Sequence, residues 1–106
     1  MKIFRNQEWK GGWFVGNFEP SAFKTDNFEV CLKKHAMDEK WPKHYHKIAT
    51  EINYLIRGKM TIQNTTFNVG DVFIIAPNEV ADPEFLEDCE LIVIKTPFVR
   101  NDKFEI

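Results

Sequence analysis

Two histidines and a glutamate lie close together in the segment HYHKIATE, residues 44 to 51. If His44 and His46 are on a strand, their side chains point to the same face, with Cβ atoms ~7 Å apart. Glu51 opens the next predicted strand, and a hairpin between 43–46 and 51–57 would bring its carboxylate near both rings. Two imidazoles and one carboxylate form the ligand set of facial-triad iron sites and of some zinc and manganese sites. The spacing therefore indicates a divalent metal site.

The elements that must hold these residues are short β-strands separated by frequent turns. No window has apolar residues at i, i+3, i+4 and i+7 over three turns, so no helix is predicted. Hairpin turns are predicted at 57–59 and 63–65. We therefore predict an all-β, antiparallel fold, and the even spacing of the strands favours a jelly-roll barrel whose mouth holds a small ligand. The predicted strands cover residues 13–18, 28–34, 43–46, 51–57, 59–63, 65–69, 71–76 and 89–96.

Composition limits the class of protein. The 106 residues, 43% of them hydrophobic and including ten Phe, fit one packed domain over residues 1–106. The longest apolar runs, 72–76 and 91–94, are too short to span a membrane. A net charge of −2, spread along the chain, indicates neither nucleic acid nor a membrane surface as a partner. Cys31 and Cys89 lie in apolar stretches without CxxC spacing, and the start has no segment of signal-peptide length, so we expect reduced thiols in a cytoplasmic protein.

The segment HYHKIATEINYLIRG resembles the first sequence motif of the cupins: HxH, three or four residues, Glu, six residues, Gly. His44, His46, Glu51 and Gly58 match that motif. GDVFIIAPNEVAD, residues 70 to 82, is similar to the second cupin motif through its first Gly and its Pro. The resemblance covers about residues 38–97 and implies a small single-domain cupin (monocupin): a double-stranded β-helix barrel with a metal site in its mouth.

Three departures from the cupin pattern affect this interpretation. Asp38 replaces the Gly that usually starts the first motif. Six residues instead of five separate Gly70 from Pro77, and Glu79 replaces the Gly that follows, which suggests a local bulge. Asp82 falls at the position of the last metal-binding histidine.

The resemblance therefore implies a ligand set of His44, His46, Glu51 and Asp82. This oxygen-rich set favours a harder ion such as Mn²⁺ or Fe²⁺ over copper, and Ni and Zn also stay open. Alternatively the metal has been lost, and Glu51 and Asp82 form a catalytic acid–base pair in which one carboxyl keeps a proton.

Several other residues are candidates for the pocket. His35 ends a predicted strand and Trp41 precedes the histidine pair, so both could border the mouth. Asn53 shares the inward face with Glu51 and could bind ligand hydroxyls or make a structural hydrogen bond. The aromatic segment 11–23 is a candidate subunit contact, because the resemblance implies a homodimer.

The sequence favours an enzyme that uses the metal to act on a small polar metabolite. A sugar or sugar acid, isomerised or epimerised with Glu51 and Asp82 as catalytic residues, is the first interpretation. Iron-dependent dioxygenation is a second. A non-enzymatic cupin that binds or senses a small molecule is a third, because the fold alone does not determine function.

Overall fold

The computed structural model describes all residues, 1–106, as strands, turns and one three-residue 3-10 helix, η1 (Lys10–Gly12). All strand pairs are antiparallel, which confirms the predicted all-β, antiparallel class. No helical segment has the length and apolar character that a membrane crossing requires. The strands are β1 (Trp13–Val15), β2 (Glu29–His35), β3 (His44–His46), β4 (Thr50–Arg57), β5 (Met60–Ile62), β6 (Thr65–Phe67), β7 (Val72–Ile75), β8 (Pro83–Phe85), β9 (Cys89–Thr96) and β10 (Lys103–Glu105).

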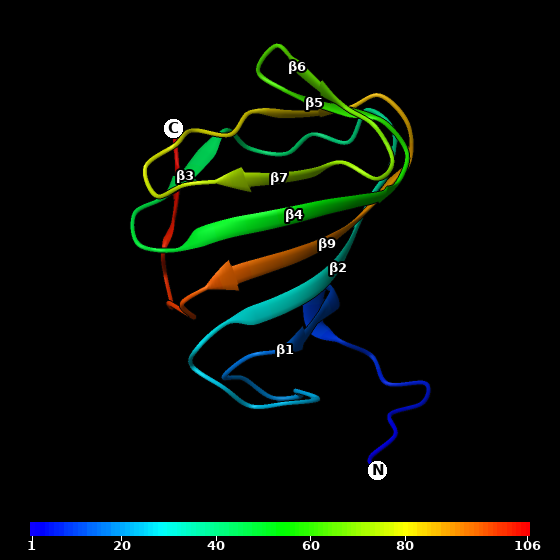
Figure 1. Cartoon of the computed structure of the whole chain (residues 1–106), viewed down its shortest axis with the longest axis vertical. Helices are drawn as coiled ribbons and strands as arrows, with labels where there is room; N and C mark the ends of the chain where they lie inside the picture. Colours follow the sequence, from blue (N-terminus) through cyan, green and yellow to red (C-terminus); the bar gives the residue numbers. More distant parts are fainter.

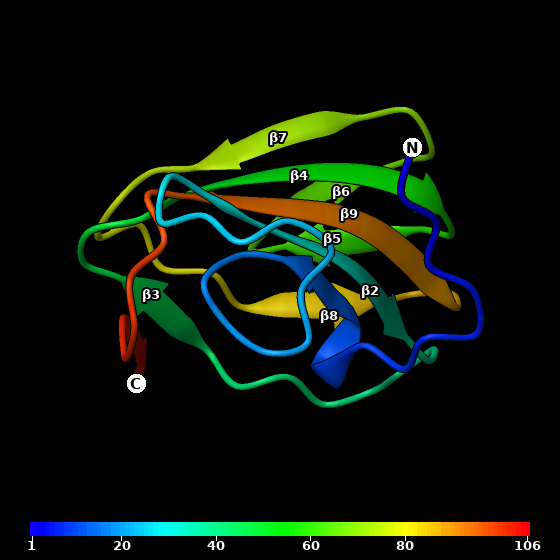
Figure 2. The same cartoon turned by 90° about the horizontal axis from the view of Figure 1, so that it is seen from below.

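The strands form two layers (Figures 1 and 2). The larger layer is a five-stranded sheet with the order β1-β2-β9-β4-β7, and its long central strands β2, β9 and β4 are paired over most of their length. The opposite layer combines the three-stranded sheet β6-β5-β8 with the two-stranded sheet β10-β3. Because side chains alternate along each strand, every strand of the larger sheet sends one set of residues toward the opposite layer.

The space between the layers has an apolar end and a polar end. In the register of β4 and β9, Leu55 faces Leu91 while Glu51 faces Lys95, four residues further along each strand. The buried core clusters around the first pair, where Leu55 and Leu91 are 0% and 3% exposed and pack with Met60 from the opposite layer. Hydrophobic burial around this end is therefore the main stabilising term, and it leaves the other end free for charged side chains.

Of the hairpin turns predicted at 57–59 and 63–65, only the second exists. Gln63 and Asn64 join β5 to β6, which pair with each other, so the hairpin at 63–65 is confirmed. The turn at Gly58 does not close a hairpin, because β4 pairs with β7 and β9 whereas β5 pairs with β6 and β8. That prediction was wrong: residues 57–59 carry the chain from one layer to the other.

Two strands were not predicted from the sequence. The short strands β8 and β10 have three residues each and carry charged residues, so neither shows a clear apolar alternation. β10 pairs with β3 and brings the C-terminal segment alongside the histidine pair (Figure 1). The predicted strand at 13–18 is shorter in the structure, where it ends at Val15.

Gly58 provides a test of the crossover between the layers. Its φ is +89°, and a Cβ at this position would lie 2.2 Å from the carbonyl oxygen of Asp88. Gly58→Ala should therefore lower the free energy of unfolding by about 2 to 3 kcal/mol. Gly70→Ala is the matched control: φ is +96° there but no atom lies within 4 Å of the added Cβ, so about 1 kcal/mol is expected. Urea denaturation measures both, and equal losses would contradict a specific clash at Gly58.

Candidate functional site

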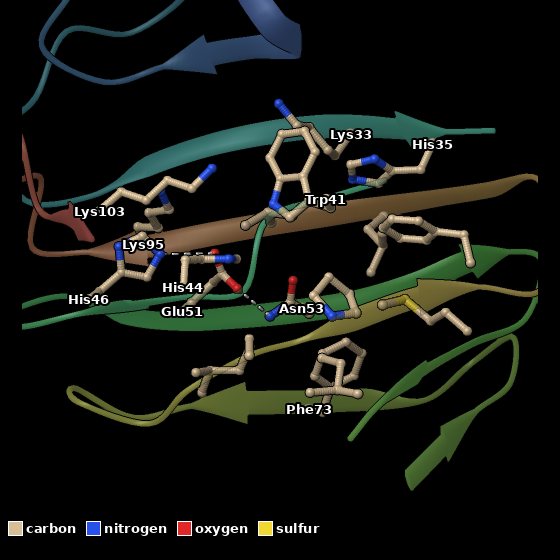
Figure 3. Close-up of a pocket in the computed structure, with 18 of the residues that line it drawn as sticks. Lys33, His35, Trp41, His44, His46, Glu51, Asn53, Phe73, Lys95 and Lys103 are labelled. Carbon is tan, nitrogen blue, oxygen red and sulfur yellow. Dashed lines mark hydrogen bonds and ion pairs between the residues drawn. The ribbon is translucent and has the colours of Figure 1, made fainter. Parts of the chain in front are cut away.

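A cavity of about 240 Å³ lies between the two layers (Figure 3). It is smaller than the ~300–1,000 Å³ of pockets for drug-sized ligands, so its ligand must be small. Strands of both layers contribute to its wall, together with Trp41 and Ala81 from the segments that precede β3 and β8. The lining residues are Trp13, Lys33, His35, Trp41, His44, His46, Glu51, Asn53, Met60, Ile62, Phe73, Ile75, Ala81, Pro83, Phe85, Leu91, Val93, Lys95 and Lys103.

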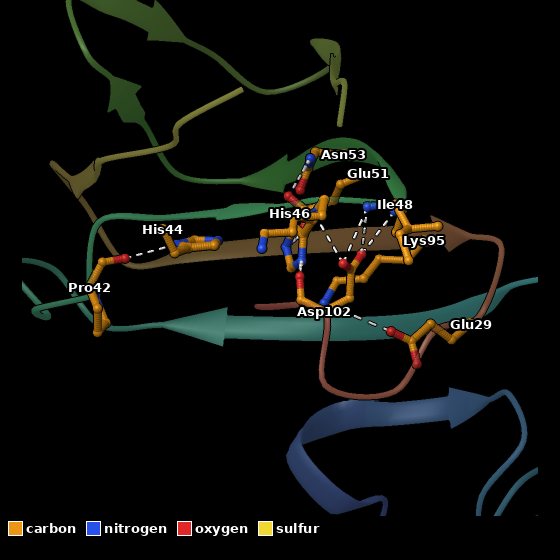
Figure 4. Close-up of polar contacts among 11 residues, drawn as sticks. Glu29, Pro42, His44, His46, Ile48, Glu51, Asn53, Lys95 and Asp102 are labelled. Carbon is orange, nitrogen blue, oxygen red and sulfur yellow. Dashed lines mark hydrogen bonds and ion pairs between the residues drawn. The ribbon is translucent and has the colours of Figure 1, made fainter. Parts of the chain in front are cut away.

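The two histidines of β3 both face this cavity, as their i, i+2 spacing predicted. His44 and His46 are 7% and 4% exposed, and their ring centroids lie 5.4 Å apart. The Nδ1 of His44 lies 2.8 Å from the carbonyl oxygen of Pro42, and the Nδ1 of His46 lies 2.9 Å from that of Asp102 (Figure 4). Because a carbonyl oxygen only accepts hydrogen bonds, each Nδ1 carries a hydrogen and each Nε2 keeps its lone pair.

Glu51 reaches the histidines from the opposite layer. The predicted hairpin between 43–46 and 51–57 is wrong, because β3 pairs with β10 and β4 pairs with β7 and β9. The expected proximity is confirmed for one of the two rings: Glu51 Oε1 lies 3.7 Å from His46 Nε2. Glu51 Oε2 accepts a hydrogen bond of 3.2 Å from Asn53 Nδ2, so the buried amide of Asn53 orients the carboxylate. Asn53 therefore lines the pocket and also makes a structural hydrogen bond.

Asp82 does not join this group. Paired backbone hydrogen bonds between His44 and Ala81, of 3.0 and 2.8 Å, direct the Ala81 side chain into the cavity. Because neighbouring side chains on extended backbone point to opposite faces, Asp82 points away, is exposed and lines a separate surface pocket with Asp38 and Glu84. The assignment of Asp82 as a fourth ligand or acid–base partner is corrected accordingly.

His35 and Trp41 both line the cavity (Figure 3). The ring of His35 stacks on Phe85 at 4.1 Å and meets the edge of Trp41 at 4.9 Å. Its Nδ1 hydrogen-bonds Glu39 Oε2 at 2.5 Å, and this bond is the main cause that lowers the pKa of Glu39. His35 is therefore fixed in orientation, as part of the wall rather than part of the His44–His46–Glu51 group.

Three lysines in the cavity wall were not identified from the sequence. Lys33 alternates with His35 on β2, and Lys95 is the charged residue at the end of the apolar strand β9, so inward alternation could have indicated both. Lys103 comes from β10, which the sequence did not predict. Burial, followed by the charge of Lys95, lowers the pKa of Lys103. The Nζ of Lys95 lies 3.8 Å from Glu29 Oε1, an ion pair at the outer rim of the site.

Burial also acts on the acids and bases next to the cavity. Removal from water is the largest cause that lowers the pKa of His46, followed by the positive charge of Lys95; the hydrogen bond to the Asp102 carbonyl and the charge of Glu51 oppose this shift. His46 is consequently a neutral imidazole at physiological pH. Burial raises the pKa of Glu29, although Lys95 counteracts this. Burial likewise raises the pKa of the Cys31 thiol to about 11, and Cys89 is shifted in the same direction.

Asp102 supports the site from behind and was also missed. It is 7% exposed, and its carboxylate accepts hydrogen bonds from the backbone N–H groups of Lys47, Ile48 and Ala49 at 2.9 to 3.2 Å (Figure 4). Burial alone would raise its pKa, but these three donors together outweigh burial and hold the pKa of Asp102 below its usual range. The same residue therefore fixes the β3–β4 turn with its side chain and the His46 ring with its carbonyl.

Two imidazoles and one carboxylate fit a divalent metal only in part. No group of three or more His, Cys, Asp and Glu side chains is arranged so that it could hold a metal ion. However, the Nε2 of His46 is buried without any hydrogen-bond partner, and both histidines have the tautomer that metal ligation requires. Ligand bonds of about 2.0 to 2.2 Å put two ligands of one ion about 3 to 3.5 Å apart, close to the 3.7 Å between His46 and Glu51. The separation of His46 Nε2 and Glu51 Oε1 is thus close to that of two ligands of one ion.

No protein-family model and no curated protein matches the chain. Solved structures do match. A protein with a double-stranded β-helix domain from Klebsiella pneumoniae has a TM-score of 0.65 and 17% identity over 70% of this chain and 66% of that one. An RmlC-like cupin protein from Ralstonia eutropha has a TM-score of 0.61 and 18% identity over 76% and 57%. The DMSP lyase DddQ from Ruegeria pomeroyi has a TM-score of 0.71 and 13% identity over 86% and 48%.

The chain has the cupin fold. The predicted double-stranded β-helix barrel is thereby confirmed. The chain spans about half of the lyase and at most 66% of the other two proteins. Identities of 13 to 18% show the cupin fold alone, so no activity is carried over to this chain from its structural neighbours, one of which is an enzyme.

Asp102 can be tested by isosteric replacement. Asp102→Asn should lower the free energy of unfolding by about 2 kcal/mol at neutral pH, because the backbone donors lose a charged acceptor. A carboxyl with a lowered folded-state pKa stabilises the fold above its unfolded pKa, so the difference between variant and wild type should begin to shrink near about pH 4 and be lost as pH falls through the lowered folded-state pKa. Urea denaturation from pH 7 to 2.5 measures this. Asp82→Asn, at an exposed aspartate, is the control and should match wild type throughout; a similar loss in it would contradict a special role for Asp102.

Proposed function

We propose that this protein is a metal-dependent enzyme of the cupin fold that binds one divalent cation through His44, His46 and Glu51 and acts on a small polar metabolite. The observation that carries the proposal is the state of His46. Its Nε2 is buried, has no hydrogen-bond partner and faces a carboxylate, while its Nδ1–H is held by a carbonyl. An unpaired buried nitrogen costs about 1 to 3 kcal/mol, and a metal ion would remove this cost.

The surrounding residues determine how such an ion would be held. The backbone carbonyls of Pro42 and Asp102 fix the two imidazoles as donors of a lone pair toward the cavity. Asn53 holds one oxygen of Glu51 and leaves the other directed at His46. A bound divalent cation supplies Lewis-acid polarisation of a substrate oxygen. With three protein ligands, open coordination positions remain for that oxygen.

Proton transfer and substrate positioning fall to residues of the cavity wall. With Asp82 outside, Glu51 is the carboxylate within the site, and the oxygen that does not bind a metal is placed to accept a proton. A cavity of about 240 Å³ accommodates a small metabolite such as a sugar or sugar acid, for which isomerisation or epimerisation needs a base and an oxygen ligand. Consumption of oxygen during turnover would instead indicate iron-dependent dioxygenation, and saturable binding without turnover would indicate a binding module.

We further propose that the protein is a homodimer that forms through the outer face of the larger sheet. Alternate residues of β2, β9, β4 and β7 make this face continuously apolar. Tyr54, Val72 and Ile74 on it are 46%, 57% and 61% exposed, and the paired partners in the register are apolar as well. The residues of this face are Val30, Leu32, Ile52, Tyr54, Val72, Ile74, Ile92 and Ile94.

A second copy of the chain suits this face better than a charged partner. None of these eight residues is charged, so two copies related by a twofold axis can bring them together without burying an unpaired charge. Lys34, Glu90 and Arg57 form ion pairs of 3.8 and 3.7 Å at one end of it, as expected for the polar rim of an interface. Monomeric proteins rarely leave contiguous apolar patches of more than a few hundred Å² exposed.

Elemental analysis of untagged protein tests the metal site. Wild type should contain close to one equivalent of a divalent metal after purification or after addition of Mn²⁺, Fe²⁺, Ni²⁺ or Zn²⁺. His46→Gln and Glu51→Gln should each lower the bound metal at least about tenfold, because each removes a ligand. Asp82→Asn is the control and should retain the metal, because its carboxylate lies outside the cavity. A wild type that gains no metal under any of these conditions would contradict the proposal.

Sedimentation velocity at several concentrations tests the dimer. Ile74→Lys places a charge on β7, where the apolar face is most exposed, and should convert the dimer to a monomer. Phe23→Lys is the matched control. Phe23 is 63% exposed and forms a β-bridge with β1, at the opposite edge of the sheet from β7. A dimer that persists in Ile74→Lys but dissociates in Phe23→Lys would instead place the interface at the N-terminal segment 11–23.

A further inference from the structure

Three lysines from three strands surround one part of the cavity (Figure 3). Lys33 comes from β2, Lys95 from β9 and Lys103 from β10, so residues 70 positions apart in the sequence meet at one site. The Nζ atoms of Lys33 and Lys103 lie 5.2 and 4.3 Å from the ring centroid of Trp41, and the Nζ of Lys95 lies 5.0 Å from that of Trp13. The two tryptophans hold the ammonium groups over the space between the layers through cation–π contacts.

The positive charge of this group is not balanced by the protein. Lys95 pairs with Glu29 at 3.8 Å, whereas neither Lys33 nor Lys103 has a carboxylate within 4.0 Å. Lys33 donates only to the carbonyl oxygen of Gly11, at 3.3 Å. Glu51 is the one acidic residue among the residues that line the cavity. Like charges held this close repel one another, so an anion that enters the cavity is attracted and also relieves the repulsion.

The rest of the cavity is apolar. Met60, Phe73, Phe85 and Leu91 form the wall around the end that adjoins the core, and Ile62 extends it. A bare inorganic anion would leave the apolar wall exposed to water. The carbon skeleton of an organic anion covers this wall, and burial of the apolar surface favours binding. The cavity of about 240 Å³ limits that skeleton to a few carbon atoms.

We propose that the cavity binds a small organic carboxylate, with the carboxylate group held by Lys33, Lys95 and Lys103 and the carbon skeleton against the apolar wall. This assignment rests on the proposed function in taking the cavity as the substrate site, and it names the chemical class of that substrate. Lysine ammonium groups suit the role because each provides a mobile point charge with three donors.

Two pairs of probes, titrated against ¹⁵N-labelled protein by NMR, test the assignment. Butyrate and its neutral isostere butyramide form one pair, and gluconate and glucitol form the other. In each titration the affinity is read from chemical-shift changes of cavity residues. At least one acid should bind about tenfold or more tightly than its neutral counterpart, because hydrogen bonds between the lysines and a charged carboxylate are stronger than those to a neutral group. The affinity for that acid should fall as salt is added. Inorganic phosphate is titrated in parallel.

Lysine variants show whether the preference comes from this group. Lys103→Met and Lys33→Met should each reduce the preference for the acid about tenfold, and Lys103→Arg should retain most of it. Lys34→Met is the matched control, because Lys34 is the neighbour of Lys33, is 71% exposed and pairs with Glu90 on the outer face. Lys95→Met is made together with Glu29→Gln, so that no buried carboxylate is left without its partner.

The outcomes separate this assignment from the metal site. If wild type binds metal but neither acid is preferred over its neutral counterpart, the carboxylate assignment is overturned while the metal proposal stands. If an acid is preferred and the lysine variants lose this preference with unchanged metal content, both are supported. If the preference exists without any metal binding, the carboxylate assignment is supported and the metal proposal fails. Tighter binding of inorganic phosphate than of either acid, or an equal loss in Lys34→Met, would overturn the assignment.

Discussion

The site depends on one anchoring interaction, the attachment of the C-terminal segment to β3 and to the turn behind it. Asp102 accepts three backbone hydrogen bonds from residues 47 to 49, and its own carbonyl oxygen fixes the ring of His46. The next residue, Lys103, begins the strand that pairs with β3 and contributes a positive charge to the cavity. A single point of attachment thus sets the backbone of the turn, the tautomer of one histidine and the position of one lysine.

The barrel combines an apolar end that stabilises the fold with a polar end that carries the charged residues of the cavity. Leu55, Leu91 and their neighbours bury apolar surface where the two layers pack directly. Four residues further along the same strands, Glu51 and Lys95 occupy equivalent inward positions. Burying these charged groups lowers stability, and the nearby unpaired Nε2 of His46 adds to that cost. The burial of apolar surface at the other end offsets this cost. The continuous pairing of β4 with β9 fixes the backbone positions of Glu51 and Lys95.

The sequence contains enough information for the fold and for most of one side of the site. Strand alternation placed His44, His46, Glu51 and Asn53 on inward faces, since this depends only on local geometry. Which strands pair is not local, so the hairpin that was expected to bring Glu51 to the histidines was wrong although the proximity was right. The position of Asp82 was also not predictable from local alternation. The stretch from Gly70 to Pro77 has an extra residue, and a shift of one position exchanges the two faces of extended backbone. Ala81 therefore lines the cavity in place of Asp82. Asp102 and Lys103 lie about 55 residues after β3 in the sequence, and no local sequence pattern predicts their contacts with it.

The exclusion of Asp82 changes how the site can work. A fourth protein ligand would fill coordination positions and add a negative charge next to Glu51, and both effects would disfavour an anionic ligand. With Ala81 in its place, a metal ion held as proposed by His44, His46 and Glu51 would keep open positions on the side of the cavity, and the lysines provide the only other strong charges in the wall. A ligand that bridges from the histidine–glutamate group to the lysines is then fixed at two points, which restricts its orientation in a way that neither group could achieve alone. The same one-residue shift that obscured the sequence motif therefore also explains why the cavity wall contains a single acidic residue, Glu51, against three lysines.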